Sequence, residues 1–161
     1  MTAGVLLGAL ILTLIVSSAM MQGITFTNAG LAHTLSTELV GGTPITTWYL
    51  GLINNSPTPT LLAGDTLASH TGWTEIAYST GYMGNRPAWG NGAVSGNATT
   101  NASTVNFAML GTYTVYGMFV CSAATGTSGT LEMEAPFSGG TQSVSSGDSL
   151  QTTMTASAVS G

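Results

Sequence analysis

The residues best suited to chemistry lie in two short segments with the sequences GWTE and NRPAW. They bring Arg86, the only cation among 161 residues, close in sequence to Glu75 and to two tryptophans, Trp73 and Trp89. A planar guanidinium binds a carboxylate through two parallel hydrogen bonds and also stacks on an indole ring. We therefore expect these four residues to form a structural clasp, with a partly buried ion pair between Glu75 and Arg86. If the tryptophans were exposed, the same residues would form a platform for a sugar.

Two further carboxylates, Glu132 and Glu134, are separated by a single residue in a predicted strand, which places both on one face of a sheet. Paired carboxylates can hydrolyse glycosides, but such sites also need a cleft of aromatic and polar groups. Calcium is a conceivable ligand because Asp148 is acidic as well, although the chain has no EF-hand-like run. We expect a solvated rim, with or without calcium, and assign no metal site.

The remaining candidates are two histidines and one cysteine. Neither His33 nor His70 has the spacing of a metal site, and we expect both at the surface or packed against a helix. Ser69 precedes His70, but the sequence lacks a GxSxG elbow. Cys121 follows an apolar run, which is typical of a buried thiol. The sequence therefore indicates no catalytic or cofactor-binding residue, and we predict a protein that is not an enzyme.

Charged residues are scarce throughout the chain. They make up 4% of it, against roughly a quarter in ordinary soluble domains. One arginine and six carboxylates give a formal net charge of -5, so the chain has too few cations to neutralise phosphates, and we expect no nucleic-acid partner. A surface this neutral is typical of a subunit that is largely covered in an assembly.

The first charged residue is Glu38, and residues 4–21 are almost continuously apolar. This length is close to that of a membrane helix, but no Lys or Arg flanks it, and the basic region of a signal peptide is missing. Three interpretations stay open: an arm or helix buried against other protein, a membrane helix, or a processed or mis-assigned start. The residues that would form the assembly arm are Val5, Leu6, Leu7, Leu10, Ile11, Leu14 and Ile15.

The elements that must position these residues are one helix and several short strands. Leu31, Leu35 and Leu39 recur at helical spacing and predict a helix over residues 28–39, with Asn28 as N-cap and a stop at residues 41–42. We expect Asp65 to cap a turn that follows it. Strands are predicted over residues 46–53, 74–79, 104–110, 112–121, 130–137 and 150–159. This pattern predicts a mainly β protein, an antiparallel sandwich or barrel-like domain over residues 23–161, preceded by an apolar N-terminal arm or helix over residues 1–22.

Several of these segments resemble small structural proteins of tailed phages. The resemblance covers about residues 25–155 and is carried by TNAGL before WYLGLI, and by NRPAW, TNASTVNFAM, VYGMFVCSA and SGDSLQTTMT. It implies a virion component, either a capsid decoration or cement protein or a tail-associated protein. The implied partners are copies of the chain and other virion proteins, above all a major capsid protein. The long apolar N-terminus departs from this pattern, and an arm woven into the particle would explain it.

Two hypotheses from other classes stay open. One is a subunit of a cell-surface filament, whose core would be an apolar N-terminal helix. The other is a carbohydrate-binding module that uses Trp73 and Trp89. For the assembly hypotheses, we expect the interface to be supplied by the arm and by the strands over residues 48–53 and 113–121, with a membrane contact possible only through the N-terminal segment.

Overall fold

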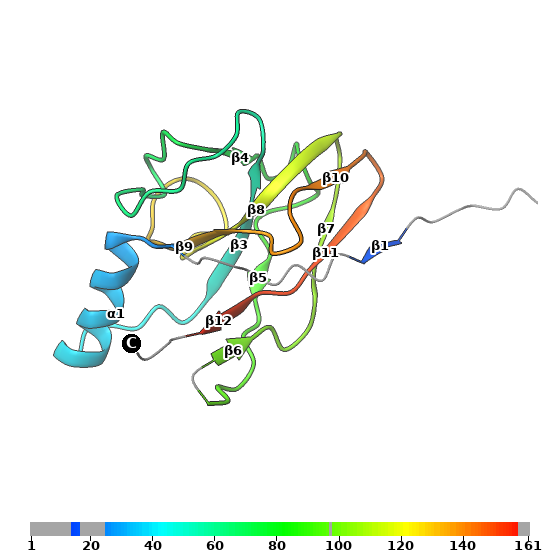
Figure 1. Cartoon of the computed structure of the whole chain (residues 1–161). Helices are drawn as coiled ribbons and strands as arrows, with labels where there is room; N and C mark the ends of the chain where they lie inside the picture. The colour runs from blue at the N-terminus through cyan, green and yellow to red at the C-terminus, as the bar shows by residue number, and fades with distance from the viewer. Residues whose placement is uncertain (1–13, 17–24, 97, 158–161) are drawn as a thin grey trace, which may run out of the picture.

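The computed structural model describes residues 14–16, 25–96 and 98–157. Over these residues the protein is mainly β, with antiparallel sheets packed as a sandwich and one helix at one end (Figure 1). The predicted fold class is confirmed. The predicted arm residues Val5, Leu6, Leu7, Leu10 and Ile11 lie outside the described part of the chain.

The larger sheet follows the strand order β2-β9-β8-β3-β4, and two further strands pair with its members. The strands are β2 (Thr25–Phe26), β9 (Leu131–Pro136), β8 (Tyr113–Cys121), β3 (Trp48–Asn54) and β4 (Thr74–Ile76), with β10 (Gln142–Val144) on β8 and β5 (Ala88–Trp89) on β3. All these pairings are antiparallel. β8 is the central strand, and its register sets Phe119 opposite Glu134 of β9.

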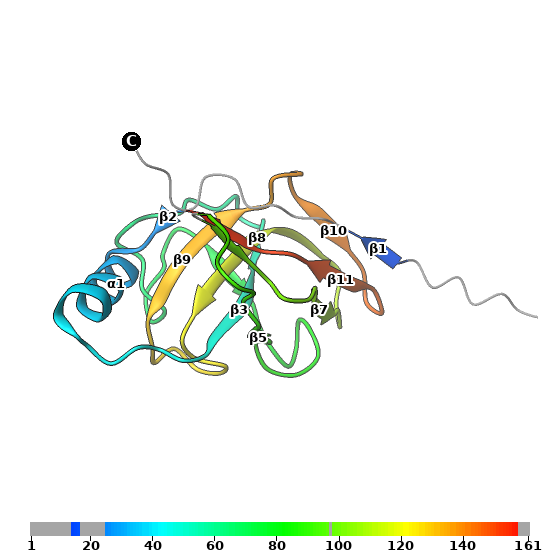
Figure 2. The same cartoon turned by 90° about the horizontal axis from the view of Figure 1, so that it is seen from below.

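The smaller sheet has the order β1-β11-β7, and a separate pair joins β12 to β6. The strands are β1 (Leu14–Val16), β11 (Ser149–Thr152), β7 (Val105–Ala108), β12 (Thr155–Ser157) and β6 (Ala98–Thr100). β1 contains the predicted arm residues Leu14 and Ile15 and runs parallel to β11, with Leu14 opposite Ser149. Figures 1 and 2 both show β1 at the end of the domain opposite the helix.

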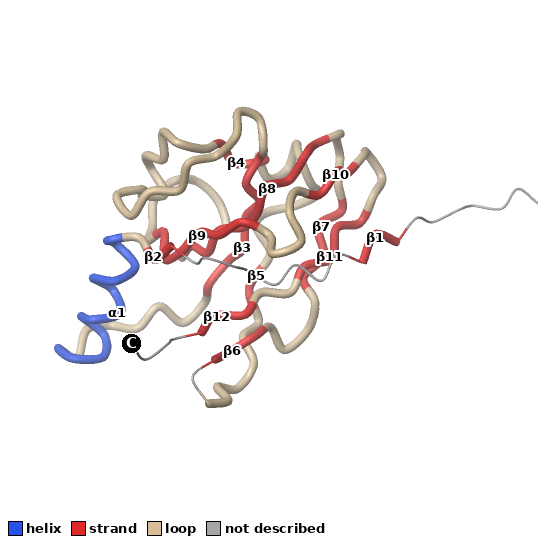
Figure 3. Tube along the Cα trace, viewed as in Figure 1, coloured by secondary structure: helices blue, strands red, loops and turns tan. Residues whose placement is uncertain are grey.

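The larger sheet is covered on both faces. Its inner face meets the smaller sheet in a core that includes Leu50, Leu52, Met118, Val120, Met133, Val105, Phe107 and Leu150. On its outer face, a second cluster joins Phe119 and Cys121 to Leu67 and Trp73 of the long loop between β3 and β4, drawn in tan in Figure 3. This double cover explains the continuous apolar runs of the sequence. The prediction that the strands over residues 48–53 and 113–121 supply an interface gains no support, because most of their side chains are buried inside the domain.

The predicted helix is α1 (Asn28–Val40). Its N-cap is Thr27 and not Asn28, because Thr27 has extended backbone geometry and its side-chain oxygen accepts a hydrogen bond from the Gly30 N–H at 3.0 Å. Gly41 ends the helix as predicted, in the left-handed conformation at φ 74° that favours glycine. Within the described residues no helix is both long and apolar enough to cross a membrane.

Candidate functional site

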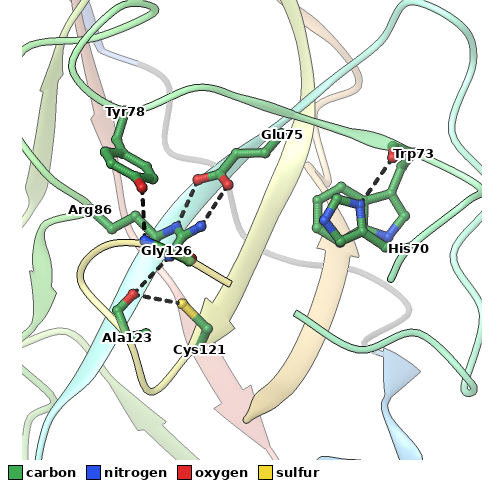
Figure 4. A network of polar contacts seen from close by, with 8 residues as sticks. All are labelled: His70, Trp73, Glu75, Tyr78, Arg86, Cys121, Ala123 and Gly126. Atoms are coloured by element: carbon green, nitrogen blue, oxygen red, sulfur yellow. Dashed lines mark hydrogen bonds and ion pairs between the residues drawn. The ribbon is translucent and has the colours of Figure 1, made fainter. Parts of the chain in front are cut away.

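The predicted ion pair between Glu75 and Arg86 is confirmed and lies at the centre of the network in Figure 4. Arg86 Nε and Nη2 donate to the two carboxylate oxygens of Glu75, each at 2.7 Å. The side chain of Arg86 is 1% exposed and that of Glu75 15%, so water screens the pair poorly. This forked, shielded geometry is the strong form of a charge-assisted hydrogen bond.

The other donors of Arg86 fix the loop that follows β8. Its Nη1 atom donates to the carbonyl oxygens of Ala123 and Gly126, both at 2.9 Å. The Tyr78 ring lies 5.0 Å from the guanidinium carbon, and the Tyr78 hydroxyl accepts a hydrogen bond from the Gly126 N–H at 2.7 Å. The clasp thus ties β4, the segment before β5 and the loop after β8 into one unit.

The two tryptophans do not belong to this clasp, so that part of the prediction is wrong. The ring of Phe119 lies 5.5 Å from the Arg86 guanidinium, and Trp73 packs against Phe119 at 5.1 Å. Trp89 is paired with Trp48 in the β3–β5 ladder and belongs to the core between the sheets. Exposed tryptophans would have favoured a carbohydrate-binding module. Trp73 and Trp89 are both buried, so they offer no aromatic surface to a sugar.

Trp73 is held by polar groups of its own loop. The His70 ring stacks on it at 3.8 Å, and the Trp73 indole N–H donates to Asp65 Oδ2 at 3.0 Å. The same Asp65 oxygen accepts the Leu62 N–H at 3.2 Å. The expectation that Asp65 caps the following turn is wrong, because the hydroxyl of Thr66 accepts the capping hydrogen bond from Ser69 N–H.

Glu134 is fully buried on the outer face of β9, beside Asp65 and Trp73. Burial, together with the negative charge of Asp65, raises the pKa of Glu134 to about 8. The carboxyl group is therefore mostly neutral at pH 7, and neither of its oxygens has a hydrogen-bond partner among the described residues. The predicted solvated rim is wrong here, because the loop between β3 and β4 covers this face of the sheet.

Glu132 is also buried, and it holds α1 in place. The Thr34 hydroxyl donates to Glu132 Oε1 at 3.0 Å, and His33 Nδ1 lies 3.5 Å from Glu132 Oε2. Burial raises the pKa of Glu132, while Thr34 and His33 reduce the shift. His33 packs edge-on against Trp48 at 5.3 Å, which confirms it as a helix-packing histidine. The inner face of α1 is thus anchored by polar contacts.

Gly30 allows α1 to approach β9 closely. A Cβ atom at this position would lie 2.2 Å from the carbonyl oxygen of Glu132, which belongs to the backbone and cannot rotate away. We expect Gly30→Ala to lower the free energy of unfolding by about 1–3 kcal/mol through overpacking, although the same change in an open helix raises it by about 0.5–1 kcal/mol. Urea denaturation measures the sign. Gly64→Ala is the control because nothing lies within 4 Å of its Cβ; equal effects at both positions would contradict the close approach.

The outer face of α1 is apolar and uncovered. Three leucines at successive helical turns, Leu31, Leu35 and Leu39, are 46%, 56% and 76% exposed, and Val40 is 82% exposed. We call these four residues the outer ridge. The leucine spacing that predicts the helix is normally the mark of a core face. Here the leucines face outward because Gly30, His33 and Thr34 occupy the face toward β9.

Across the described residues no group of three or more His, Cys, Asp and Glu side chains is placed to hold a metal ion. Cys121 is buried as predicted, and burial raises the pKa of its thiol, which keeps it in the unreactive form. The chemistry available is internal, in buried polar contacts that hold the loops and the helix on the sandwich. Within the described residues, the outer ridge is a row of exposed apolar side chains that a partner could cover.

A comparison with protein-family models and one with curated proteins found no match to this chain.

Proposed function

We propose that this protein is a non-enzymatic structural subunit of a virion, which stabilises a tailed-phage particle by contact. It would act as a capsid decoration or cement protein or as a tail-associated protein. Its partners would be further copies of itself and other virion structural proteins, including the major capsid protein. The observation that carries the proposal is the outer ridge, a row of large apolar side chains held outward on an otherwise well-packed domain.

The distribution of charge supports the same proposal. Four of the chain's seven charged side chains are buried, namely Asp65, Arg86, Glu132 and Glu134. A fifth, Glu75, is neutralised by Arg86. The surface that remains carries little charge to keep copies apart, and this suits a protein that is permanently covered by neighbours.

The second candidate is a filament subunit at the cell surface. What favours it is that β1 and α1 lie at opposite ends of the domain (Figure 1). When contacts join opposite ends of neighbouring subunits, the assembly is head-to-tail, and it grows into an open fibre if the rotation does not close a ring.

Electron microscopy of the native assembly tests the two candidates together. We expect the chain to be found in a closed particle or in a phage tail. A continuous fibre made of this chain alone would instead support the filament. A dispersed monomer at the concentrations used for imaging would contradict both.

A further inference from the structure

The outer ridge of α1 needs a specific occupant. Leu31, Leu35 and Leu39 span about 12 Å of helix at 1.5 Å per residue. The helix has no acidic residue in its first turn and no basic residue in its last. Its one charged side chain is Glu38, which is exposed. The occupant must therefore be apolar and must recognise shape rather than charge.

A second copy of the ridge is too small to be that occupant. Burying a leucine or valine removes roughly 100 Å² of apolar surface from water, so four residues supply about 400 Å² on each copy. A stable interface buries about 800 Å² per partner. Symmetric packing of α1 on α1 falls short by about half.

The chain itself carries an apolar segment that matches the ridge. Leu6 and Leu10, and likewise Leu7 and Ile11, repeat the four-residue spacing of the outer ridge. No charged residue occurs in the whole segment before β1. Ridges of side chains at this spacing interdigitate when two apolar stripes pack together. Each copy would use both its ridge and its segment, and so would bury apolar area in two contacts rather than one.

The position of β1 favours a neighbouring copy as the receiver of the segment. β1 runs parallel to β11 from Leu14, opposite Ser149, so residues 1–13 join the domain at the end where β11 begins. That end lies opposite α1 in both Figure 1 and Figure 2. The chain therefore enters β1 far from its own ridge, and the ridge of a neighbouring copy is free to receive it.

We propose that residues 5–11 of one copy pack on the outer ridge of a neighbouring copy and so link the subunits head to tail. The inference rests on the proposed assembly function and names the contact that would carry it. Each copy gives a segment at one end and receives one at the other.

Cross-linking between two variants of the full chain, each with one introduced cysteine, tests the contact. We expect a mixture of Leu10→Cys and Leu35→Cys proteins to form a disulfide-linked dimer under mild oxidation. The yield should be at least tenfold higher than with Met83→Cys in place of Leu35→Cys, because Met83 is at least as accessible as Leu35, at 68% against 56% exposure, but lies off the helix. The native Cys121 is buried and is present in every sample alike. Equal yields with both partners, or links only between two Leu10→Cys copies, would overturn the proposal.

Two further variants, each with an introduced glutamate, test the same contact without thiol chemistry. Leu35→Glu should reduce the assembled fraction in sedimentation at least tenfold, whereas Met83→Glu should leave it unchanged, and a cooperative denaturation curve checks that each variant folds. If the full chain assembles and Leu35→Glu has no effect, this contact is wrong while the assembly function stands. If the full chain never assembles, the proposed function fails as well. A third outcome concerns lipid. If the wild type binds phosphatidylcholine vesicles, Leu35→Glu abolishes that binding and no cross-link forms, then the ridge binds lipid and the proposal is overturned.

Discussion

Replacing Arg86 by methionine is expected to lower the free energy of unfolding by about 3–5 kcal/mol, the range observed when one partner of a buried ion pair is removed. The substitution leaves the Glu75 carboxylate without its partner. It also removes the donors to the carbonyl oxygens of Ala123 and Gly126, so the loop after β8 loses its anchor. For a chain of this size the melting temperature should fall by about 10 °C.

Two matched variants separate the causes of this loss. Arg86→Lys keeps the positive charge but cannot make the two-pronged contact, so we expect a stability between the wild type and Arg86→Met. Adding Glu75→Gln to Arg86→Met should restore part of the loss, because no unpaired charge remains. Thermal and urea denaturation measure all three proteins. An Arg86→Met protein within about 1 kcal/mol of the wild type would show that the clasp contributes little.

Glu134 is expected to make the protein more stable in acid than at neutral pH. Its pKa of about 8 in the folded state lies well above the ordinary value of 4.5 that it regains on unfolding. Between these two values unfolding releases a proton, so the free energy of unfolding falls as the pH rises, by up to about 1.4 kcal/mol per pH unit. Above about pH 8 the folded state is ionised too, and the slope from this group ends. The raised pKa of Glu132 acts in the same direction.

Glu134→Gln should stabilise the protein by a few kcal/mol at pH 7 and remove most of the slope, because the amide mimics the neutral acid and does not ionise. Urea denaturation at half-unit steps from pH 4.5 to 8.5 measures the effect. Glu38→Gln is the control, since Glu38 is an exposed carboxylate on α1 and its replacement should leave the slope in place. A wild type whose stability is constant or rises across this range would contradict the buried neutral state of Glu134.

The fold could be predicted from the sequence because its signals are local. Short β-rich runs divided by Gly, Asn and Pro predict the strands, and the predicted strand over residues 112–121 becomes β8 with its start shifted by one residue. The last predicted strand, over residues 150–159, is instead divided into β11 and β12, which pair with different partners. This strand pairing depends on residues more than 40 positions away, so the local sequence does not indicate it.

The site could be predicted only in part, for a similar reason. Arg86 is the only cation in the chain, and Glu75 is the carboxylate nearest to it in the sequence, so their pairing could be predicted. The aromatic neighbours of Arg86 could not be predicted in this way. Phe119 belongs to a strand distant in sequence, and it takes the position beside Arg86 that was expected for a tryptophan. The burial of Glu132 and Glu134 depends on what covers β9, and the direction of the α1 leucines depends on Gly30 fitting against that strand. The spacing of the leucines was visible in the sequence, but the face that they occupy was not.

The central claim is that this protein works by assembling, and imaging of the purified full chain by electron microscopy in detergent-free buffer tests it most directly. The wild type should form ordered assemblies, with closed particles or rings expected from the virion proposal and open fibres from the filament candidate. A full-length variant with Leu7→Asp and Leu10→Asp should stay dispersed and folded. A wild type that is monodisperse and monomeric at micromolar concentration, indistinguishable from this variant, would contradict the account.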